Sequence, residues 1–207
     1  REARQQGREV HMGIVFGIMV LKGAELPDSE WETKRKKYKY RVVFQGNNII
    51  NQNWEQAVYK DGSSKPVSME AGKVADWWAC LPEHTQEQAD AEQAYVQADM
   101  RGCETWVSLP NLEDCDDAFP EWFREKIKGM DRPVIQMRKA VYGHPMAGEY
   151  WERHCDERLR SVGFVPVPGV DSFYMYPSLD LVLTVYVDDL ILSGPVKHMD
   201  KGWKLIR

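Results

Sequence analysis

Two adjacent aspartates between two apolar arms constrain the fold of this chain more than any other feature. The stretch runs from Leu181 to Gly194 and places Asp188-Asp189 between segments rich in Val, Leu and Ile. Short runs of such residues favour β-strands, and the lack of room for a loop predicts an antiparallel hairpin with a tight turn at the aspartates. Two carboxylates at such a tip repel each other, and a hard divalent cation relieves that repulsion. Because Asp is common in turns, a polar turn without a metal is an equal alternative for this stretch alone.

Composition limits the class of protein and its surroundings. The chain has 207 residues and 43% hydrophobic content, which suits one packed globular domain or one domain with an appendage. Its four cysteines form no Cys-x-x-Cys pair, so the spacing gives neither a zinc signature nor a disulfide framework and favours a reducing compartment. The longest apolar run, Ile14–Leu21, is too short to span a membrane. The formal net charge of -5 means that contact with nucleic acid would have to rest on local charge.

One strongly basic segment stands out in this acidic chain. From Lys34 to Arg41, six of eight residues are basic and two tyrosines interleave them. The segment fits an edge strand protected from aggregation by lysines. It also fits a strand that presents cations to the phosphates of a nucleotide or nucleic acid, and we favour this second interpretation.

A second carboxylate precedes an aromatic residue by five positions. Gln88-Ala89-Asp90 is followed by Tyr95, so a short strand ending at Asp90 would place both side chains near one pocket. Taken alone, the simpler interpretation is that Asp90 caps a helix beginning at Ala91.

The remaining segments predict a scaffold of helices and strands. Apolar residues at helical spacing predict helices over Pro66–Leu81 and Gly148–Val162, and Trp151 and Cys155 are assigned to the core without a chemical role. Residues 1–13 are polar and expected to be poorly ordered, and the insertion Asn111–Arg132 is expected to hold one or two helical turns. Strands are predicted, beside the final hairpin, over Ile14–Leu21 (buried), Trp106–Leu109, Val134–Met137 and Phe173–Tyr176.

Four segments, taken in order, resemble the reverse transcriptase domain of copia-type LTR retrotransposon polyproteins, from about residue 39 to residue 194. They are the basic strand Tyr38–Gly46, the Asp90 segment with Tyr95, the segment Arg138–Gly143 followed by Trp151, and the tetrapeptide Tyr186-Val187-Asp188-Asp189. Each segment is only moderately specific, but their occurrence in the family's order identifies the resemblance.

The resemblance implies an α+β fold made of the fingers and palm of a reverse-transcriptase-like polymerase. The palm would be an antiparallel sheet with helices packed on one face, including Pro66–Leu81 and Gly148–Val162. The implied segments are residues 1–33 (N-terminal extension and leading strand), 34–86 (fingers), 87–194 (palm with the catalytic motifs) and 195–207 (start of the segment after the catalytic hairpin). The thumb, ribonuclease H and integrase regions of the family are absent from this sequence, so we expect a fragment of a longer polyprotein.

The implied activity is RNA-directed DNA polymerisation, in which a primer 3′-hydroxyl attacks the α-phosphate of a dNTP. Two Mg²⁺ ions, for which Mn²⁺ could substitute, would be held by Asp90 and Asp188 with the backbone carbonyl of Ala91. The adjacent Asp189 would contribute charge more than direct ligation. Tyr186 and Val187 flank the motif.

The resemblance also implies contacts with substrates. Arg41, with Lys39 as a less certain companion, would bind the triphosphate. Tyr95 would lie beneath the sugar and exclude a 2′-hydroxyl, and the alternative is a tyrosine that fills the palm core. Template and nucleotide would be positioned by Arg138, Tyr142, Gly143 and Met146.

Two departures from the family pattern stand in this positioning segment. Met146 replaces a usual glutamine, and Glu149 replaces a usual arginine, so a positive charge has become negative. These departures support the main alternative, a catalytically inactive remnant that keeps the fold and could bind nucleic acid. A second alternative is another metal-dependent phosphoryl-transfer enzyme.

The implied partners are an RNA or DNA template with its primer, dNTPs, and the integrase and ribonuclease H of the same polyprotein, with no membrane. The implied location is the cytoplasm, inside virus-like particles.

Overall fold

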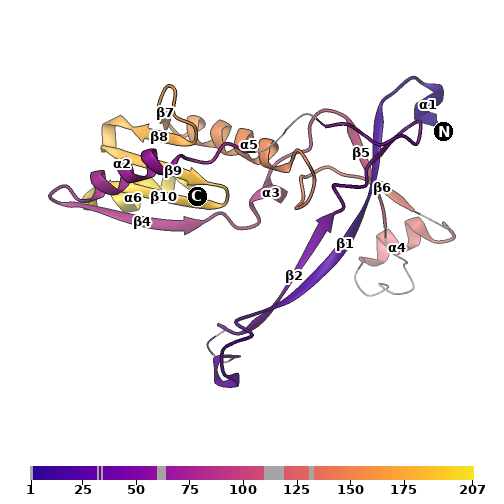
Figure 1. The fold of residues 1–207 in the computed structure, drawn as a ribbon, viewed down its shortest axis with the longest axis horizontal. Helices are drawn as coiled ribbons and strands as arrows, with labels where there is room; N and C mark the ends of the chain where they lie inside the picture. The colour runs from indigo at the N-terminus through magenta and orange to yellow at the C-terminus, as the bar shows by residue number, and fades with distance from the viewer. Residues whose placement is uncertain (1, 32, 34, 60–63, 110–118, 131–132) are drawn as a thin grey trace. The chain divides into compact units, whose positions relative to one another are not determined.

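The computed structural model describes residues 2–31, 33, 35–59, 64–109, 119–130 and 133–207 (Figure 1). The chain divides into two compact units, each made of two separate stretches of sequence. Unit 1 comprises Arg1–Lys60 and Met100–Pro145, and unit 2 comprises Asp61–Asp99 and Met146–Arg207. The four segments predicted from the sequence divide the chain by expected role instead, and they remain a prediction. Among the described residues, no helix is both long and apolar enough to span a bilayer.

Unit 1 contains a mixed sheet with the strand order β2-β1-β5-β6, in which β3 also pairs with β1. β1 runs parallel to β5, and the other pairs are antiparallel. The strands are β1 (Val10–Lys22), β2 (Lys37–Phe44), β3 (Ile50–Asn51), β5 (Glu104–Ser108) and β6 (Val134–Gln136). Two short helices, α1 (Glu2–Gln5) and α4 (Glu121–Ile127), and a 3-10 turn at Asp28–Trp31 complete the unit. Its core contains Phe44, Ile49, Ala57, Val107 and Met137.

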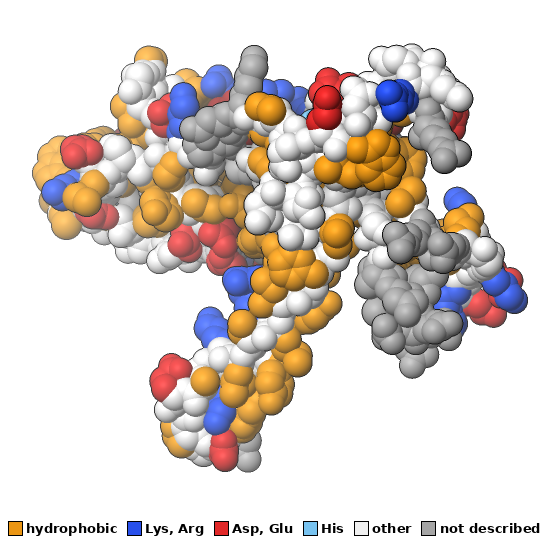
Figure 2. Space-filling model, turned by 45° about the vertical axis from the view of Figure 1, so that its right-hand side comes forward, with side chains coloured by type: hydrophobic (Ala, Val, Ile, Leu, Met, Phe, Trp, Pro, Cys, Tyr) orange, Lys and Arg blue, Asp and Glu red, His pale blue; other side chains and the backbone are white. Residues whose placement is uncertain are grey.

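The first strand differs from expectation in both length and burial. β1 begins at Val10, and α1 precedes it, so the prediction of poor order over residues 1–13 is wrong for the described part. Beyond Ile14, β1 pairs with β2 alone and forms a two-stranded ribbon. A ribbon of two strands cannot cover its own faces, so Phe16, Ile18 and Met19 are 45%, 41% and 66% exposed. Figure 2 shows hydrophobic side chains along this ribbon, and the predicted buried strand is therefore an exposed one.

Unit 2 contains a sheet of five strands in the order β4-β10-β9-β8-β7, and every pair in it is antiparallel. The strands are β4 (His84–Asp90), β7 (Val165–Pro166), β8 (Phe173–Tyr176), β9 (Leu181–Tyr186) and β10 (Asp189–Pro195). The near-continuous apolar run of β9 suits a strand that is packed on both faces, and its residues Leu181–Val185 are all buried. The α+β class and the antiparallel sheet are confirmed.

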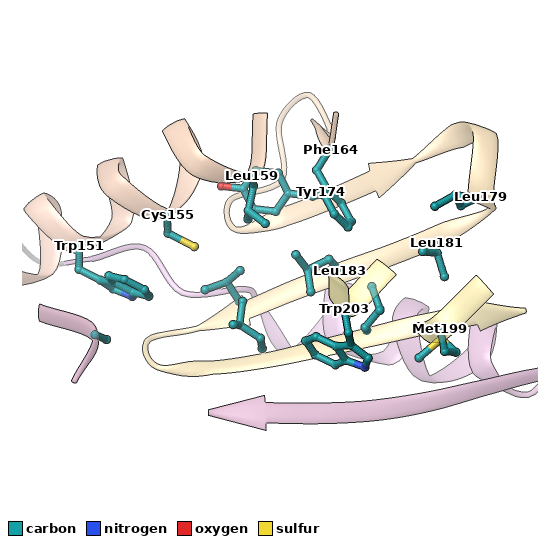
Figure 3. Packing of buried hydrophobic residues seen from close by; sticks show 14 residues of the cluster. Trp151, Cys155, Leu159, Phe164, Tyr174, Leu179, Leu181, Leu183, Met199 and Trp203 are labelled. Carbon is teal, nitrogen blue, oxygen red and sulfur yellow. The ribbon is translucent and has the colours of Figure 1, made fainter. Parts of the chain in front are cut away.

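The helices of unit 2 cover both faces of its sheet rather than one. α2 (Met69–Ala79) places Ala71 and Ala75 against Val182 and Phe173. The neighbouring Leu181 and Leu183 point to the opposite face, because successive side chains alternate across a strand. There they join a larger core with α5 (Ala147–Ser161) and α6 (Val196–Ile206), as Figure 3 shows.

Local signals explain where the two long helices lie. The Ser68 hydroxyl accepts a hydrogen bond from the Ala71 backbone N–H at 3.2 Å, so α2 begins after Ser68 and not at Pro66. α5 buries Ala147, Trp151, Cys155 and Leu159 on one face, as predicted. It is followed by Gly163 at φ 102, a conformation that glycine adopts without strain.

Candidate active site

Asp90 occupies the last position of β4, at the edge of the unit 2 sheet. In the antiparallel register it lies directly opposite Asp189, the first residue of β10. Asp90 does not cap a helix. The next helix, α3 (Ala94–Gln97), begins after Gln93, which adopts φ 51. The strand-end interpretation of Asp90 therefore describes the structure, and the helix-cap interpretation is wrong.

The hairpin between β9 and β10 turns through only two residues, Val187 and Asp188. Val187 has φ 56, which is strained for a β-branched residue by about 1–3 kcal/mol. Both backbone carbonyls of the turn accept hydrogen bonds from outside it. The Trp151 indole N–H donates to Val187 at 2.6 Å, and the Ala91 backbone N–H donates to Asp188 at 2.7 Å. These bonds hold the turn in its strained geometry beside the end of β4.

The third carboxylate is restrained by a neighbour on the adjacent strand. The Gln88 side-chain amide donates to Oδ1 of Asp189 at 2.9 Å. Gln88 lies two residues before Asp90 and so points to the same side of the sheet. Asp188 and Asp189 are partly exposed, and Asp90 is exposed. The three carboxylates thus meet solvent at one corner of the sheet.

The chemistry of this donor set fits a hard divalent cation. Three aspartate carboxylates and the nearby carbonyl of Ala91 offer oxygen only, which Mg²⁺ and Mn²⁺ prefer. The three carboxylates do not form a close cluster: in the described part of the chain, the only three ligand-type side chains with ligand atoms within 4.8 Å of one another lie elsewhere. Facing carboxylates repel one another, so separation is the expected arrangement of these side chains by themselves.

Tyr95 lies in α3 and packs, half-buried, against the large core of unit 2. Ala91 packs against the same core, so the segment after β4 is anchored at both positions. The structure therefore gives Tyr95 a packing role and leaves its predicted contact with the sugar open.

In unit 1, Arg41 of β2 lies over the ring of Tyr142, with 5.6 Å between the guanidinium carbon and the ring centroid. The Phe44 backbone N–H donates to the Tyr142 carbonyl at 2.7 Å. The sequence placed Arg41 and Tyr142 in different motifs. The structure brings these two predicted substrate-binding residues together, beside the end of β2.

Gly143, the residue after Tyr142, also lies against the backbone of β2. It has φ 85, and a Cβ atom at this position would overlap the Phe44 carbonyl oxygen. Only glycine lets the backbone approach β2 so closely in this conformation. Arg138 is exposed, and its carbonyl accepts a hydrogen bond from the Met100 backbone N–H at 2.9 Å.

The cations of the basic segment fall into two sets. Arg35 and Lys36 bind Glu30 and Asp28 at 3.2 and 2.7 Å, so their charges are locally neutralised. Lys39 and Arg41 are exposed on β2, and no carboxylate of the described residues pairs with either. β2 is also an edge strand, as the protective interpretation requires. Lys34 lies outside the described residues, as do the stretches 111–118 and 131–132 of the predicted insertion.

Lys39 and Arg41 share one face of the ribbon with apolar side chains. They lie directly opposite Val20 and Ile18 of β1, and residues opposite each other in an antiparallel pair point to the same side. The face therefore combines exposed positive charge with exposed apolar surface, a combination that suits phosphate and sugar contacts.

The two departures in the positioning segment lie at the start of α5. Met146 precedes its first residue, and Glu149 is in its first turn. Glu149 accepts a hydrogen bond from Arg153 at 3.2 Å, and a negative charge in the first turn favours the helix dipole. The replacement of arginine by glutamate thus has a local structural consequence for α5.

Two residues that support the site were not singled out from the sequence as chemically important. The sequence predicts Trp151 as a core residue, yet its indole N–H also donates to the Val187 carbonyl in the turn before Asp188. In the sequence Gln88 is only a neighbour of Asp90, yet its side chain binds Asp189. A buried Trp requires a hydrogen-bond acceptor, and that requirement was the available signal for Trp151. Nothing in the sequence indicated the partner of Gln88.

Comparison with known proteins adds one finding. Residues 28–206 match the family model described as reverse transcriptase (RNA-dependent DNA polymerase). A search of curated proteins finds no match.

Proposed function

The chain belongs to the reverse transcriptase (RNA-dependent DNA polymerase) family, and on that premise we propose that it forms the fingers and palm of a retrotransposon polymerase. The observation that carries the proposal is the register of Asp90 opposite Asp189, with Asp188 in the adjoining two-residue turn. Carboxylates from two separate strands at one corner are the arrangement that nucleotidyl transfer needs.

The proposed origin is a copia-type LTR element. It is supported by the Tyr186-Val187-Asp188-Asp189 tetrapeptide and by the order of the four motifs along the chain. In this proposal the chain acts within a polyprotein that also carries integrase and ribonuclease H, in cytoplasmic virus-like particles.

In the proposed reaction, the chain transfers a nucleotide from a dNTP to a primer 3′-hydroxyl on an RNA or DNA template. Asp90 and Asp188, with the Ala91 carbonyl, would hold two Mg²⁺ ions. When bound, the ions lower the pKa of the primer hydroxyl and offset the charge of the triphosphate. Asp189, held by Gln88, adds negative charge beside them. Trp151 keeps the turn in place by its bond to Val187.

The substrate contacts are proposed from charge and position within each unit. Arg41 would bind the triphosphate in bidentate fashion, with its guanidinium plane set by Tyr142 and with Lys39 as a second cation. Tyr95 would discriminate the sugar. The backbone and side chains around Arg138, Gly143 and Met146 would position template and nucleotide.

The alternative is an inactive remnant that retains the fold and binds nucleic acid. It is favoured by Met146 and Glu149, because a carboxylate in the positioning segment repels a triphosphate. The intact Asp90, Asp188 and Asp189 favour the active enzyme.

Primer extension distinguishes the two candidates. The chain, and a longer segment of its parent protein that contains it, would be assayed on an RNA template with Mg²⁺ or Mn²⁺, each beside its Asp188→Asn twin. DNA synthesis by the unsubstituted protein but not by its Asp188→Asn variant supports an active polymerase. If the unsubstituted protein and the variant are both folded and bind template–primer, but neither extends the primer, the result supports an inactive remnant.

A further inference from the structure

The starts of β1 and β5 bring together in unit 1 three side chains of types that bind metals, none of which has been given a role above. The two strands are parallel and begin side by side, with Val10 opposite Glu104. Glu9 directly precedes β1, His11 is its second residue, and Cys103 directly precedes β5. Residues at the same end of adjacent parallel strands lie close together although they are far apart in sequence.

The three side chains have the geometry of a ligand set. One ligand atom from each of Glu9, His11 and Cys103 lies within 4.8 Å of the others, and this is the only such group found in the described part of the chain. Nε2 of His11 is 3.4 Å from a carboxylate oxygen of Glu9. His11 is 5% exposed, Cys103 is half-buried and Glu9 is exposed. His11 is therefore held in place by the surrounding protein, whereas Glu9 leaves the cluster accessible to an ion from solvent.

A fourth residue orients the histidine. The Tyr59 hydroxyl lies 2.7 Å from Nδ1 of His11 and its ring packs edge-on against the imidazole. Which of the two atoms donates depends on the histidine tautomer. Metal binding needs the tautomer in which Nδ1–H donates to the tyrosine oxygen, because Nε2 then carries a lone pair on the side of Glu9. A partner that holds the other ring nitrogen in this way is a regular companion of metal-binding histidines.

We infer that Glu9, His11 and Cys103 form a binding site for a thiophilic divalent cation of the Zn²⁺ class. Three protein ligands of the N, O and S types leave one position of a tetrahedron for water. The donor set differs in kind from the all-oxygen corner at Asp90 and Asp188, so the site would select zinc where that corner selects magnesium.

The distances require little rearrangement. Ligand bonds of about 2.0 to 2.3 Å place neighbouring ligand atoms of a tetrahedral zinc site roughly 3.3–3.8 Å apart. The 3.4 Å between His11 and Glu9 already falls in that range. The two distances that involve the Cys103 sulfur lie within 4.8 Å, so they must shorten by on the order of 1 Å. A small change of the Cys103 χ1 angle together with movement of the exposed Glu9 side chain can supply this.

The simpler interpretation is a buried histidine satisfied by Tyr59, with Glu9 as an occasional ion-pair partner. That interpretation gives Cys103 no part. It leaves the Cys103 thiol with only a weak hydrogen bond to the Glu104 carbonyl at 3.8 Å, whereas a bound cation would take the sulfur as a ligand in its thiolate form. The role of Cys103 is therefore the point on which the two interpretations differ.

The first test measures the affinity of the chain for Zn²⁺ after a chelator has removed any bound metal from the purified protein. The expected result is one Zn²⁺ per wild-type chain, with affinity lowered at least about 100-fold in Cys103→Ser and about tenfold in the exposed Glu9→Gln variant. The matched control is Cys80→Ser, which removes an exposed free cysteine from unit 2 and should bind zinc as the wild type does. Equal affinity in wild type and Cys103→Ser would overturn the inference.

Cobalt binding to the wild-type protein provides a second test, which does not depend on whether the Cys103→Ser variant folds. Co²⁺ bound to wild-type protein should show thiolate-to-cobalt charge-transfer absorption, which zinc abolishes. The absorption should persist in Asp188→Asn, because the polymerase corner takes no part, so the test is independent of the proposed polymerase activity. Stoichiometric Co²⁺ binding without thiolate absorption would overturn the inference.

Discussion

Asp90 faces Asp189, and not Asp188, across the antiparallel ladder between β4 and β10. Like charges directly opposite each other destabilise a strand pair by roughly 0.2–1 kcal/mol. Asp188 avoids that position because it lies in the turn, where its carbonyl is bound by the Ala91 N–H. The two adjacent aspartates of the motif therefore have different surroundings and should respond differently to the same substitution.

Asp188→Asn should lower the rate of primer extension by about a thousandfold, equivalent to roughly 4 kcal/mol of transition-state stabilisation. Asp189→Asn should lower it less, and should raise the free energy of unfolding slightly in the absence of metal because it removes the charge opposite Asp90. Single-turnover extension and urea unfolding of both variants check this. Equal loss of activity in the two would contradict the different roles given to them.

Trp151→Phe should slow extension about tenfold while the protein remains folded. Phenylalanine fills most of the buried space but cannot donate to the Val187 carbonyl, so the strained turn loses one of its two restraints. Leu159→Val, in the same helix and core, is the matched control because it alters packing without touching the turn. If both variants lose the same activity for the same loss of stability, Trp151 acts through packing alone.

Arg41→Ala should raise the KM for dNTP about tenfold and leave template–primer affinity nearly unchanged. Arg41→Lys should restore only part of the effect, because an ammonium group lacks the bidentate geometry of the guanidinium. Arg35→Ala is the matched control, since Arg35 is already paired with Glu30. Should Arg41→Ala weaken template–primer binding alone, the ribbon contacts nucleic acid and not the triphosphate.

Tyr95→Ala should admit ribonucleotides if the ring lies beneath the incoming sugar. It should also destabilise unit 2 by about 2–4 kcal/mol, because the ring packs against the core. The ratio of kcat/KM for dNTP to that for NTP separates the two roles. Loss of stability with an unchanged ratio would make Tyr95 a core residue only.

His144 should make the stability of unit 1 fall in mild acid. Burial, and secondarily His11, lower the pKa of its imidazole from 6.5 to about 4. Between pH 6.5 and pH 4 the imidazole of His144 is therefore protonated in the unfolded chain but neutral in the folded one. The free energy of unfolding of unit 1 is highest above pH 6.5 and decreases as the pH falls toward 4. The difference amounts to about 3 kcal/mol.

Urea unfolding at pH 7 and at pH 4.5 measures this loss. His144→Gln removes the titrating group at similar volume and should flatten the dependence between these values. A slope that is unchanged in the variant would assign the acid sensitivity to other groups.

The sequence was informative wherever a local pattern sufficed. The two apolar, β-branched-rich arms of residues 181–194 predicted the hairpin, and apolar spacing predicted the buried face of α5. The predicted site residues Asp90, Asp188 and Asp189 do lie at one corner of one sheet. Their roles remain predictions.

The features that the sequence did not predict depend on tertiary contacts. The residues Ile14–Leu21 look like a buried strand, but their exposure depends on how many strands pair beside them. The face that α2 covers depends on the chain connection, since its apolar stripe fits either side of a sheet. The Trp151–Val187 bond and the meeting of Glu9 with Cys103 join residues far apart in sequence, and no spacing rule anticipates them.

The pairing of β4 with β10 also sets an order of events during biosynthesis. Asp90 is synthesised about a hundred residues before the end of its partner strand at Pro195. On the ribosome, β4 therefore stays unpaired until β10 has emerged, since pairing between distant segments cannot precede their synthesis. A translation product that stops before β10 contains Asp90, but its β4 segment exposes backbone N–H and C=O groups that can pair with another chain. Premature termination should consequently yield aggregation rather than a smaller folded enzyme.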